Sequence, residues 1–291
     1  MGVRVGLHAL GIGSGANPAV ITSVASAAEE RGFATLWAGE HVVMVDRPGS
    51  RYPYSEDGRI AVKSDTDWLD PLVLFGFLAR ATSRIRLATG ILLLPEHNPV
   101  AAAKTVASID VLSLGRFTLG VGVGWSAEEF EALGVPFEGR ARRTEEYVEA
   151  MRVLWRDDVA SYSGTHVHFD RVRCYPKPPR RAVPVVFGGN SDLALRRVAE
   201  HGDGWYGFNV LLNELPARLE VLHAACQAAG RAQASVDTAV ALVGVQPSDL
   251  PQLEALGVME VVLVEAPPAD PDEATEWVTE LARRWNVTPP S

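Results

Sequence analysis

Glu40 and His41 place a carboxylate and an imidazole side by side, directly after a short apolar run at 35–38. An imidazole donates or accepts a proton near neutral pH, so His41 is a candidate general acid or base. A histidine at such a point is equally suited to a structural hydrogen bond, and its position does not separate the two roles. His8 follows an earlier apolar run in the same way.

Two glycine-rich stretches could approach a ligand closely. Gly188, Gly189, Asn190 and Ser191 lead into a helical pattern, so backbone donors and the helix dipole would converge where an anion could bind. The alternative is an ordinary tight turn in which Asn190 or Ser191 caps the helix. The stretch 120–124 has GxGxG spacing, which excludes the GxGxxG dinucleotide fold, and its glycines either admit a flat ring or fit a crowded barrel interior.

Other chemistries find little support. His166 and His168 lack a third ligand at a suitable spacing, so we expect no metal site. GxSxG and HExxH motifs are absent from the sequence, which argues against the common hydrolases. Cys174 and Cys226 are too few for a disulfide scaffold or a thiolate metal site and indicate a reducing compartment.

Elements that would position these residues are clear in the sequence. Eight short β-branched runs alternate with amphipathic helical patterns, and eight parallel strands close a barrel. We therefore predict one (β/α)8 TIM-barrel domain spanning residues 1–291, in which strand C-termini carry the chemistry. The runs are Val3–Leu7, Thr35–Ala38, Leu87–Ile91, Phe117–Val121, Val183–Phe187, Gly204–Gly207, Val240–Val245 and Val261–Val264.

Helix starts are marked by an acceptor followed by proline at Asn17-Pro18, Asp70-Pro71 and Asn98-Pro99. Ser126 and Glu129 have the spacing of a capping box, in which each side chain satisfies the other residue's backbone N–H.

Two insertions interrupt the alternation. Residues 42–69 follow the second strand and are rich in Gly, Pro, Asp, Ser and Tyr, so we expect a lid over the C-terminal mouth of the barrel. Residues 158–182 precede the fifth strand and resemble a hairpin with a proline-rich return. We expect this hairpin to cover the same mouth.

The net charge of −9 argues against nucleic acid and anionic membranes as partners. We expect a small-molecule substrate instead. With neither a signal-peptide pattern nor an apolar stretch of about 20 residues, a cytoplasmic location is expected.

Four blocks of sequence, considered together, point to a family. They are LWAGEH at 36–41, the stretch at 84–125, GRARRTEEYVEAMRVLW at 139–155 and VPVVFGGNSDLALRRVAEHGDGW at 183–205. These blocks closely resemble the bacterial-luciferase-like family, and specifically its deazaflavin-dependent branch. The resemblance covers about residues 1–230 in consistent order.

This resemblance implies a barrel with the ring of coenzyme F420 in its mouth and the cofactor phosphate held after the fifth strand. Gly188, Gly189 and Asn190 match the phosphate-binding turn. His41 matches a position that faces the ring and is assigned as the catalytic residue, with Glu40 beside it in the cofactor site.

The same resemblance implies a cis peptide bond between Gly90 and Ile91, in a bulge that supports the ring from behind. Val123 and Gly124 match residues that line the cofactor.

Two positions depart from the branch that oxidises sugar phosphates. That branch has an acid where this chain has Trp125 and a tryptophan where it has Val45, so we do not expect its proton relay. We assign Trp125 and Val45 to the substrate pocket. The basic stretch 171–181 offers a place for the long anionic tail of F420.

The function implied is an F420-dependent oxidoreductase that exchanges a hydride with an organic substrate. An FMN-dependent monooxygenase is the main alternative. A non-catalytic flavin-binding protein and, more distantly, a metal-dependent hydrolase also stay open. Family resemblance further leads us to expect a homodimer.

Overall fold

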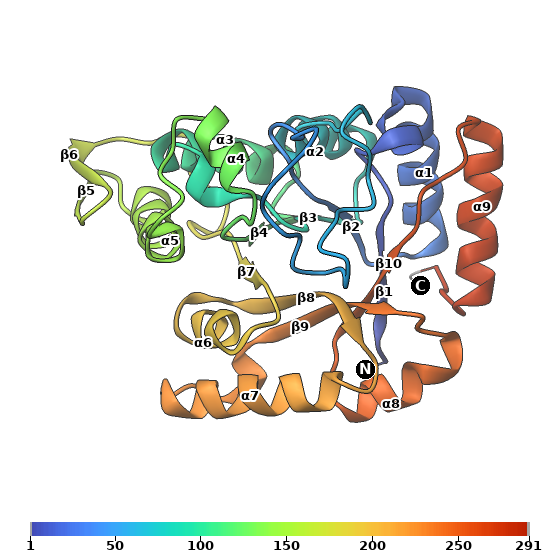
Figure 1. Ribbon diagram of the computed structural model, residues 1–291. Coiled ribbons are helices and arrows are strands. Elements are labelled where there is room, and N and C mark those ends of the chain that lie inside the picture. Colours follow the sequence, from blue (N-terminus) through green and yellow to red (C-terminus); the bar gives the residue numbers. More distant parts are fainter. Residues whose placement is uncertain (1, 290–291) are drawn as a thin grey trace.

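The structure is a computed structural model that describes residues 2–289. Eight parallel strands close into a barrel in the order β1-β10-β9-β8-β7-β4-β3-β2 (Figure 1). All eight predicted runs are strands of this barrel, so the predicted TIM-barrel fold is confirmed. The strands are β1 (Arg4–His8), β2 (Thr35–Ala38), β3 (Arg86–Thr89), β4 (Phe117–Val121), β7 (Val185–Gly188), β8 (Gly204–Leu211), β9 (Asp237–Val243) and β10 (Glu260–Val264).

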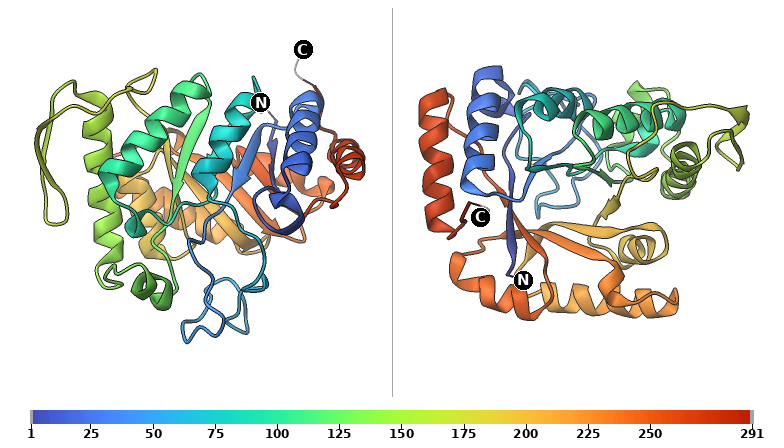
Figure 2. Two further views of the ribbon diagram at one scale, coloured as in Figure 1. Left: turned by 90° about the horizontal axis from the view of Figure 1, so that it is seen from above. Right: turned by 180° about the vertical axis from the view of Figure 1, so that it is seen from behind.

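Helices surround the barrel, and the first and last long helices lie side by side (Figure 2). The long helices are α1 (Pro18–Arg31), α2 (Pro71–Ala81), α3 (Pro99–Leu112), α5 (Arg140–Arg156), α6 (Asp192–His201), α7 (Leu215–Ala228) and α9 (Pro271–Arg284). The short helical segments are η1 (Gly13–Ala16), η2 (Leu94–Glu96), α4 (Ala127–Ala132), η3 (Gln233–Ser235), η4 (Pro247–Asp249) and α8 (Leu250–Ala255). Among the described residues, no helix is long and apolar enough to cross a membrane.

Three helix starts confirm the predicted capping pattern. The side chains of Asn17, Asp70 and Asn98 each accept a hydrogen bond from a backbone N–H in the first turn of the following helix. In each case proline occupies the first helical position, where its missing donor costs nothing. The caps fix where α1, α2 and α3 begin, and so fix the lengths of the loops that precede them.

Side chains on the strands divide into an outer and an inner core, because successive residues of a strand point to opposite faces. The outer core lies between strands and helices. In the inner core the rings of Trp37 and Tyr206 stack with centroids 4.6 Å apart. The buried members of this inner cluster are Trp37, Ala88, Val186, Tyr206, Ala239, Ala241 and Val262.

A hydrogen-bonded polar group lies at the N-terminal end of the barrel. The buried carboxylate of Glu260 accepts hydrogen bonds from Trp37 Nε1 at 2.8 Å and from Thr35 Oγ1 at 3.0 Å. A small pocket of about 30 Å³ remains beside Glu260 and Trp37, and a far larger space, of about 500 Å³, lies at the C-terminal ends of the strands.

Residues 42–69 form the predicted lid. They contain no helix or strand, and their side chains line the cavity at the C-terminal end of the barrel. Figure 2 (left) shows this segment as blue loops that project from one side of the molecule. Trp68 forms an isolated bridge with Ile12, which ties the end of the lid to the loop after β1.

Residues 158–182 contain the predicted hairpin, with β5 (Ala160–Ser163) antiparallel to β6 (His168–Val172). The expectation that this hairpin covers the mouth is wrong. It lies against the outer helix α5, at the edge of the molecule (Figure 1), where Tyr162 donates to Glu149 at 3.0 Å. None of its residues lines the cavity at the C-terminal end.

The basic residues of this segment are also not placed for a cofactor tail. Lys177 donates to the carbonyl oxygens of Leu154 and Asp157, and Arg180 donates to the carbonyl of Gly115, just before β4. These contacts fix the return of the chain at the N-terminal side of the barrel. The prediction that 171–181 holds the tail of F420 is therefore wrong.

Candidate functional site

A cavity of about 500 Å³ lies at the C-terminal ends of the strands, beneath the lid. It brings together residues that are far apart in sequence. Seven of the predicted site residues line it: Glu40, His41, Gly90, Ile91, Trp125, Gly188 and Gly189. The other four, Val45, Val123, Gly124 and Asn190, do not form part of its wall.

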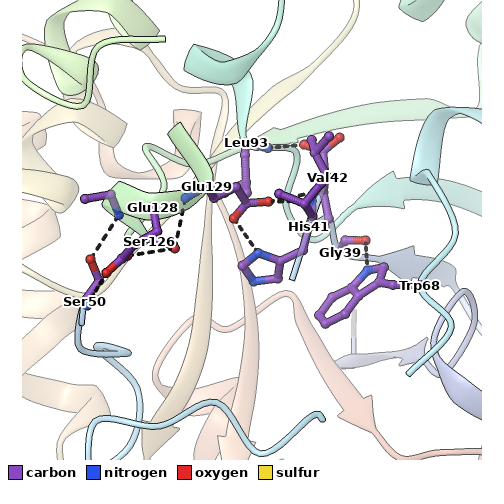
Figure 3. Close-up of polar contacts among 12 residues, drawn as sticks. Gly39, His41, Val42, Ser50, Trp68, Leu93, Ser126, Glu128 and Glu129 are labelled. Carbon is purple, nitrogen blue, oxygen red and sulfur yellow. Dashed lines mark hydrogen bonds and ion pairs between the residues drawn. The ribbon is translucent and has the colours of Figure 1, made fainter. Parts of the chain in front are cut away.

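His41 is held in this cavity by a buried carboxylate from α4. Its Nδ1 lies 2.8 Å from Glu129 Oε2, and the two side chains are 8% and 1% exposed (Figure 3). Glu129 also accepts from the backbone N–H groups of Val42 and Val43, at 2.7 and 3.2 Å. A carboxylate fixed by several donors favours the proton on Nδ1, so Nε2 of His41, which has no partner within residues 2–289, is left for a ligand.

The expected capping box at Ser126 is only half formed. Ser126 Oγ accepts from the backbone N–H of Glu129 at 3.3 Å, as predicted. The Glu129 side chain does not return to Ser126, because it binds His41 instead. The sequence pattern found the right pair of residues and missed the role of the second.

Glu128, next to Glu129, binds the middle of the lid. Its Oε1 accepts from the backbone N–H groups of Gly49 and Ser50 at 2.6 and 3.0 Å, and Ser50 Oγ accepts from Ala127 N at 3.0 Å (Figure 3). The start of α4 therefore fixes both the beginning and the middle of the lid relative to His41.

Glu40 supports the loop after β3. Its carboxylate accepts from the Leu93 backbone N–H at 2.6 Å and lies 2.9 Å from His97 Nε2. Burial alone lowers the pKa of His97, but the hydrogen bond and the charge of Glu40 outweigh it and raise that pKa. The Glu40 carboxylate is occupied by these contacts. Glu40 was predicted for the cofactor site, and the structure places its carboxylate behind the loop that carries Gly90 and Ile91.

Glu96 is an acid that sequence reasoning missed. It is 9% exposed, and neither carboxyl oxygen has a hydrogen-bond partner within the described chain. Burial, with the charges of Glu129 and Glu40, raises the pKa of Glu96 to about 9. At neutral pH it is therefore a neutral carboxylic acid behind the cavity wall. No spacing or motif in the sequence singled out Glu96.

The predicted cis peptide bond between Gly90 and Ile91 is present. The Ile91 side chain fits against two glycines, because a Cβ on Gly122 would collide with it and a Cβ on Gly188 would lie 3.0 Å from its Cγ2. A Cβ on Gly120 would collide with the Thr89 carbonyl of the neighbouring strand. Glycines 120 and 122 therefore fit a crowded interior, and the flat-ring alternative is not needed to explain them.

The turn after β7 leads into α6, as expected both for a phosphate site and for an ordinary tight turn. Gly189 has φ of +109°, a conformation that favours glycine, and Ser191 caps α6 by accepting from Ala194 N at 3.2 Å. Asn190 Nδ2 donates to the Phe208 carbonyl at 2.7 Å, which fixes the turn against β8. Ser191 is exposed at the N-terminus of a ten-residue helix, where an anion is favoured.

Aromatic side chains cover the remaining wall. Trp125 contacts His41 edge-on, with ring centroids 5.9 Å apart, and contacts Tyr52 of the lid at 5.3 Å. Trp68 approaches His41 at 5.0 Å and donates to the Gly39 carbonyl at 3.1 Å. The aromatic residues of the lid were not predicted individually. The prediction that residues 42–69 form a lid over the mouth nevertheless implied that they lie near the cavity.

Val45, Val123 and Gly124 were predicted for the site but lie outside the cavity wall. Val45 is half-buried within the lid. Gly124 has φ of +76°, and a Cβ there would lie 2.6 Å from the Phe130 ring, so packing against α4 accounts for this glycine. Val123, next to it, is half-buried.

Comparison with known proteins shows the family and supports the fold. Residues 4–249 match the family model of the luciferase-like monooxygenases. An uncharacterised protein of Mycobacterium tuberculosis is 36% identical over 270 residues, which are 91% of this chain and 94% of that protein. An FMNH2-dependent dimethylsulfone monooxygenase of Pseudomonas putida is 31% identical over 169 residues, 57% of this chain and 46% of that enzyme.

Among solved structures, the coenzyme F420-dependent tetrahydromethanopterin reductase of Methanopyrus kandleri superposes with a TM-score of 0.74 at 16% identity. The match covers 98% of both chains, so the two share one fold along their whole length. With a family model matching most of its sequence, this chain belongs to the luciferase-like monooxygenase family.

Proposed function

We propose that this chain is an oxidoreductase that binds coenzyme F420 in the cavity and exchanges a hydride between it and an organic substrate. The observation that carries the proposal is the His41–Glu129 pair inside an aromatic cavity. Reduction of a carbonyl carbon or oxidation of an alcohol requires a proton as well as a hydride. An imidazole with Nδ1 fixed and Nε2 unpartnered is suited to provide or accept that proton.

The residues present fit such a cofactor. A planar ring suits the apolar and aromatic cavity, in which Gly90 and Ile91 form one wall. A phosphate suits the turn at Gly188, Gly189 and Asn190, since it leads into the N-terminus of α6. We assign these five residues to the cofactor, with Glu40 acting behind them through the loop after β3.

When bound, F420 would supply the hydride acceptor or donor, and the protein would supply position and proton transfer. His41 Nε2 would hold the proton near the reacting atom, while Glu129 keeps the ring in one orientation. The rings of Trp68 and Trp125 flank His41 and would keep water from it. Trp125 would also contact the substrate.

The phosphate site can be tested without disturbing its turn. Gly189 is a poor target, because any other residue would be strained at its φ of +109°. A Cβ there would also lie 2.9 Å from the Ala194 side chain. Ser191→Asp keeps a good helix cap and adds a negative charge, and Ser191→Asn keeps the cap without the charge. We expect Ser191→Asp to weaken F420 binding about tenfold or more in calorimetry, and Ser191→Asn to bind within about twofold of wild type.

Equal affinities of the two variants would show that the phosphate is bound elsewhere. Failure of the wild type to bind either F420 or FMN would overturn the proposed function itself.

An FMN-dependent monooxygenase is the second candidate, favoured by the likeness to the dimethylsulfone monooxygenase. Side-by-side calorimetry of F420 and FMN separates the two. Tighter binding of FMN, with oxygen uptake coupled to an oxygenated product, would favour the monooxygenase. Tighter binding of F420, with no oxygen uptake by its reduced form, is the result we expect.

A further inference from the structure

His8 and Tyr206 meet on the floor of the cavity, apart from the His41–Glu129 pair. His8 ends β1 and Tyr206 lies in β8, and His8 Nδ1 is 2.9 Å from the Tyr206 hydroxyl oxygen. The two residues are 8% and 1% exposed, and both line the cavity. Tyr206 is held by its stack on Trp37, so the position of its hydroxyl is fixed.

The direction of this hydrogen bond follows from the surroundings. Burial lowers the pKa of His8 to about 4, so its ring is neutral at physiological pH. Burial also raises the pKa of Tyr206, so its phenol keeps its proton. The hydroxyl has His8 Nδ1 as its one hydrogen-bond partner within residues 2–289, and donation to Nδ1 is the arrangement that gives this buried O–H an acceptor within the chain. Tyr206 therefore donates to Nδ1, which leaves the imidazole proton on Nε2.

Nε2 of His8 is a donor without a partner in the described chain. This nitrogen is not fully buried, so it keeps contact with the open space of the cavity that His8 lines. A neutral N–H donor in apolar surroundings is best satisfied by a neutral oxygen acceptor.

We propose that His8 and Tyr206 form a carbonyl-binding site, in which His8 Nε2–H donates to a carbonyl oxygen of the bound ligand and Tyr206 fixes the tautomer. Nothing in the His41–Glu129 pair requires this second donor. The carbonyl has two sources, the dione edge of a flavin or deazaflavin ring, or a ketone substrate. The proposal rests on the proposed function only in using the same cavity.

The experiment uses two ligands and three variants of the full-length chain. Lumiflavin, labelled with 13C at its carbonyl carbons, provides the ring without a phosphate, so its binding does not depend on the turn at Ser191. Acetophenone and ethylbenzene differ by one carbonyl oxygen, and their affinities are compared through quenching of tryptophan fluorescence. The variants are His8→Leu, His8→Gln and Tyr206→Phe, and His8→Gln retains an N–H donor.

If the ring supplies the carbonyl, the affinity for lumiflavin should fall about tenfold in His8→Leu and about threefold in Tyr206→Phe. The resonance of one labelled carbonyl of bound lumiflavin should also shift in these variants. If a ketone substrate supplies it, the preference for acetophenone over ethylbenzene should fall by the same factors while lumiflavin binding stays unchanged. In either case His8→Gln should recover most of the loss, which a merely structural role would not explain.

Tyr162→Phe is the matched control, since it removes a hydroxyl that donates to Glu149 on the hairpin, away from the cavity. It should bind both ligands as wild type does. Melting temperatures establish that each variant folds, and Tyr206→Phe carries the test if His8→Leu does not. Unchanged lumiflavin affinity, carbonyl resonances and acetophenone preference in Tyr206→Phe, and in His8→Leu where it folds, would overturn the carbonyl site and leave the F420 proposal standing.

Discussion

The lid at 42–69 and the hairpin at 158–182 are fixed by the same device and have different consequences. Both are insertions into the barrel whose backbone N–H groups donate to glutamates on a neighbouring helix. In the lid the acceptors are Glu128 and Glu129 of α4. In the hairpin the acceptor is Glu146 of α5, which binds the N–H groups of Thr165, His166 and Val167.

The difference is in what else the carboxylate holds. Glu129 binds His41 as well as the lid, so any motion of the lid start is coupled to the orientation of the imidazole. Among the described residues, Glu146 accepts hydrogen bonds from the hairpin turn alone, and the cavity lies elsewhere. Position over the cavity, rather than the anchoring device, therefore distinguishes the insertion that belongs to our proposed site from the one that does not.

The lid anchor is also insensitive to pH near neutrality. Hydrogen bonds, from its own backbone N–H and from Ser50 and Gly49, outweigh desolvation and lower the pKa of Glu128 to about 2. The carboxylate stays charged above pH 4, so the lid should remain attached throughout the physiological range.

Replacement of His41 should have the largest effect. We expect His41→Ala to lower kcat by about 10²- to 10⁴-fold, because proton transfer by a positioned side chain contributes that much. Cofactor affinity, measured by calorimetry, should change little. The matched variant on the hairpin, His168→Ala, removes an exposed imidazole and should retain full turnover.

Full turnover of His41→Ala would leave His41 a structural residue and would remove the main distinction between the two insertions.

Replacement of Glu129 should have the next largest effect. Glu129→Gln keeps an oxygen for Val42 and Val43 but loses the charge that holds His41. Loss of one charge-assisted hydrogen bond corresponds to a fall in kcat of about 10- to 100-fold. KM should change by less than about threefold, since Glu129 positions His41 and is buried behind it. A rise in KM with kcat unchanged would instead assign Glu129 to the lid alone.

The lid side also contains a third carboxyl group, Glu96, for which the hairpin has no counterpart. Its pKa in the folded chain is about 9, against 4.5 for an exposed glutamate, so the folded state binds one proton more between these pH values. The free energy of unfolding should therefore fall as pH rises from 4.5 to 9, by at most about 1.4 kcal/mol per pH unit.

Glu96→Gln removes this titration, and urea unfolding between pH 5 and 9 measures it. We expect the free energy of unfolding of the variant to change less with pH than that of wild type, and to be higher than that of wild type above pH 7. Parallel curves for the two proteins would mean that Glu96 titrates normally.

Much of the fold was predictable because it depends on local patterns. The strand runs are continuous and apolar, and Asn17, Asp70 and Asn98 cap their helices through neighbours two or three residues away. The path of the hairpin was not predictable in this way. Its sequence specifies two strands and a turn, but the side of the barrel on which it lies depends on contacts with α5.

The site shows the same division. The strand-end rule selected His41, Ile91 and Gly188, the family resemblance added Gly90, and all four line one cavity. The partner of His41 lies 88 residues away in sequence, and the local pattern assigned Glu129 to a capping box instead. Glu96 was missed because its unusual state depends on burial and on two other carboxylates, which no spacing reveals.

The smallest effect is expected for the hairpin anchor. Glu146→Gln keeps an oxygen for the hairpin turn but removes the negative charge that strengthens its bonds to Thr165, His166 and Val167. Amide hydrogen exchange at these three residues should become faster by about 10-fold, as expected when a bond to a charged acceptor is weakened. Cofactor affinity and kcat should stay within about twofold of wild type, because none of these residues lines the cavity. Glu129→Gln is the matched comparison, since it makes the same chemical change at the other insertion. A loss of turnover in Glu146→Gln comparable to that in Glu129→Gln would show that the hairpin is coupled to the site, and the contrast between the two insertions would not hold.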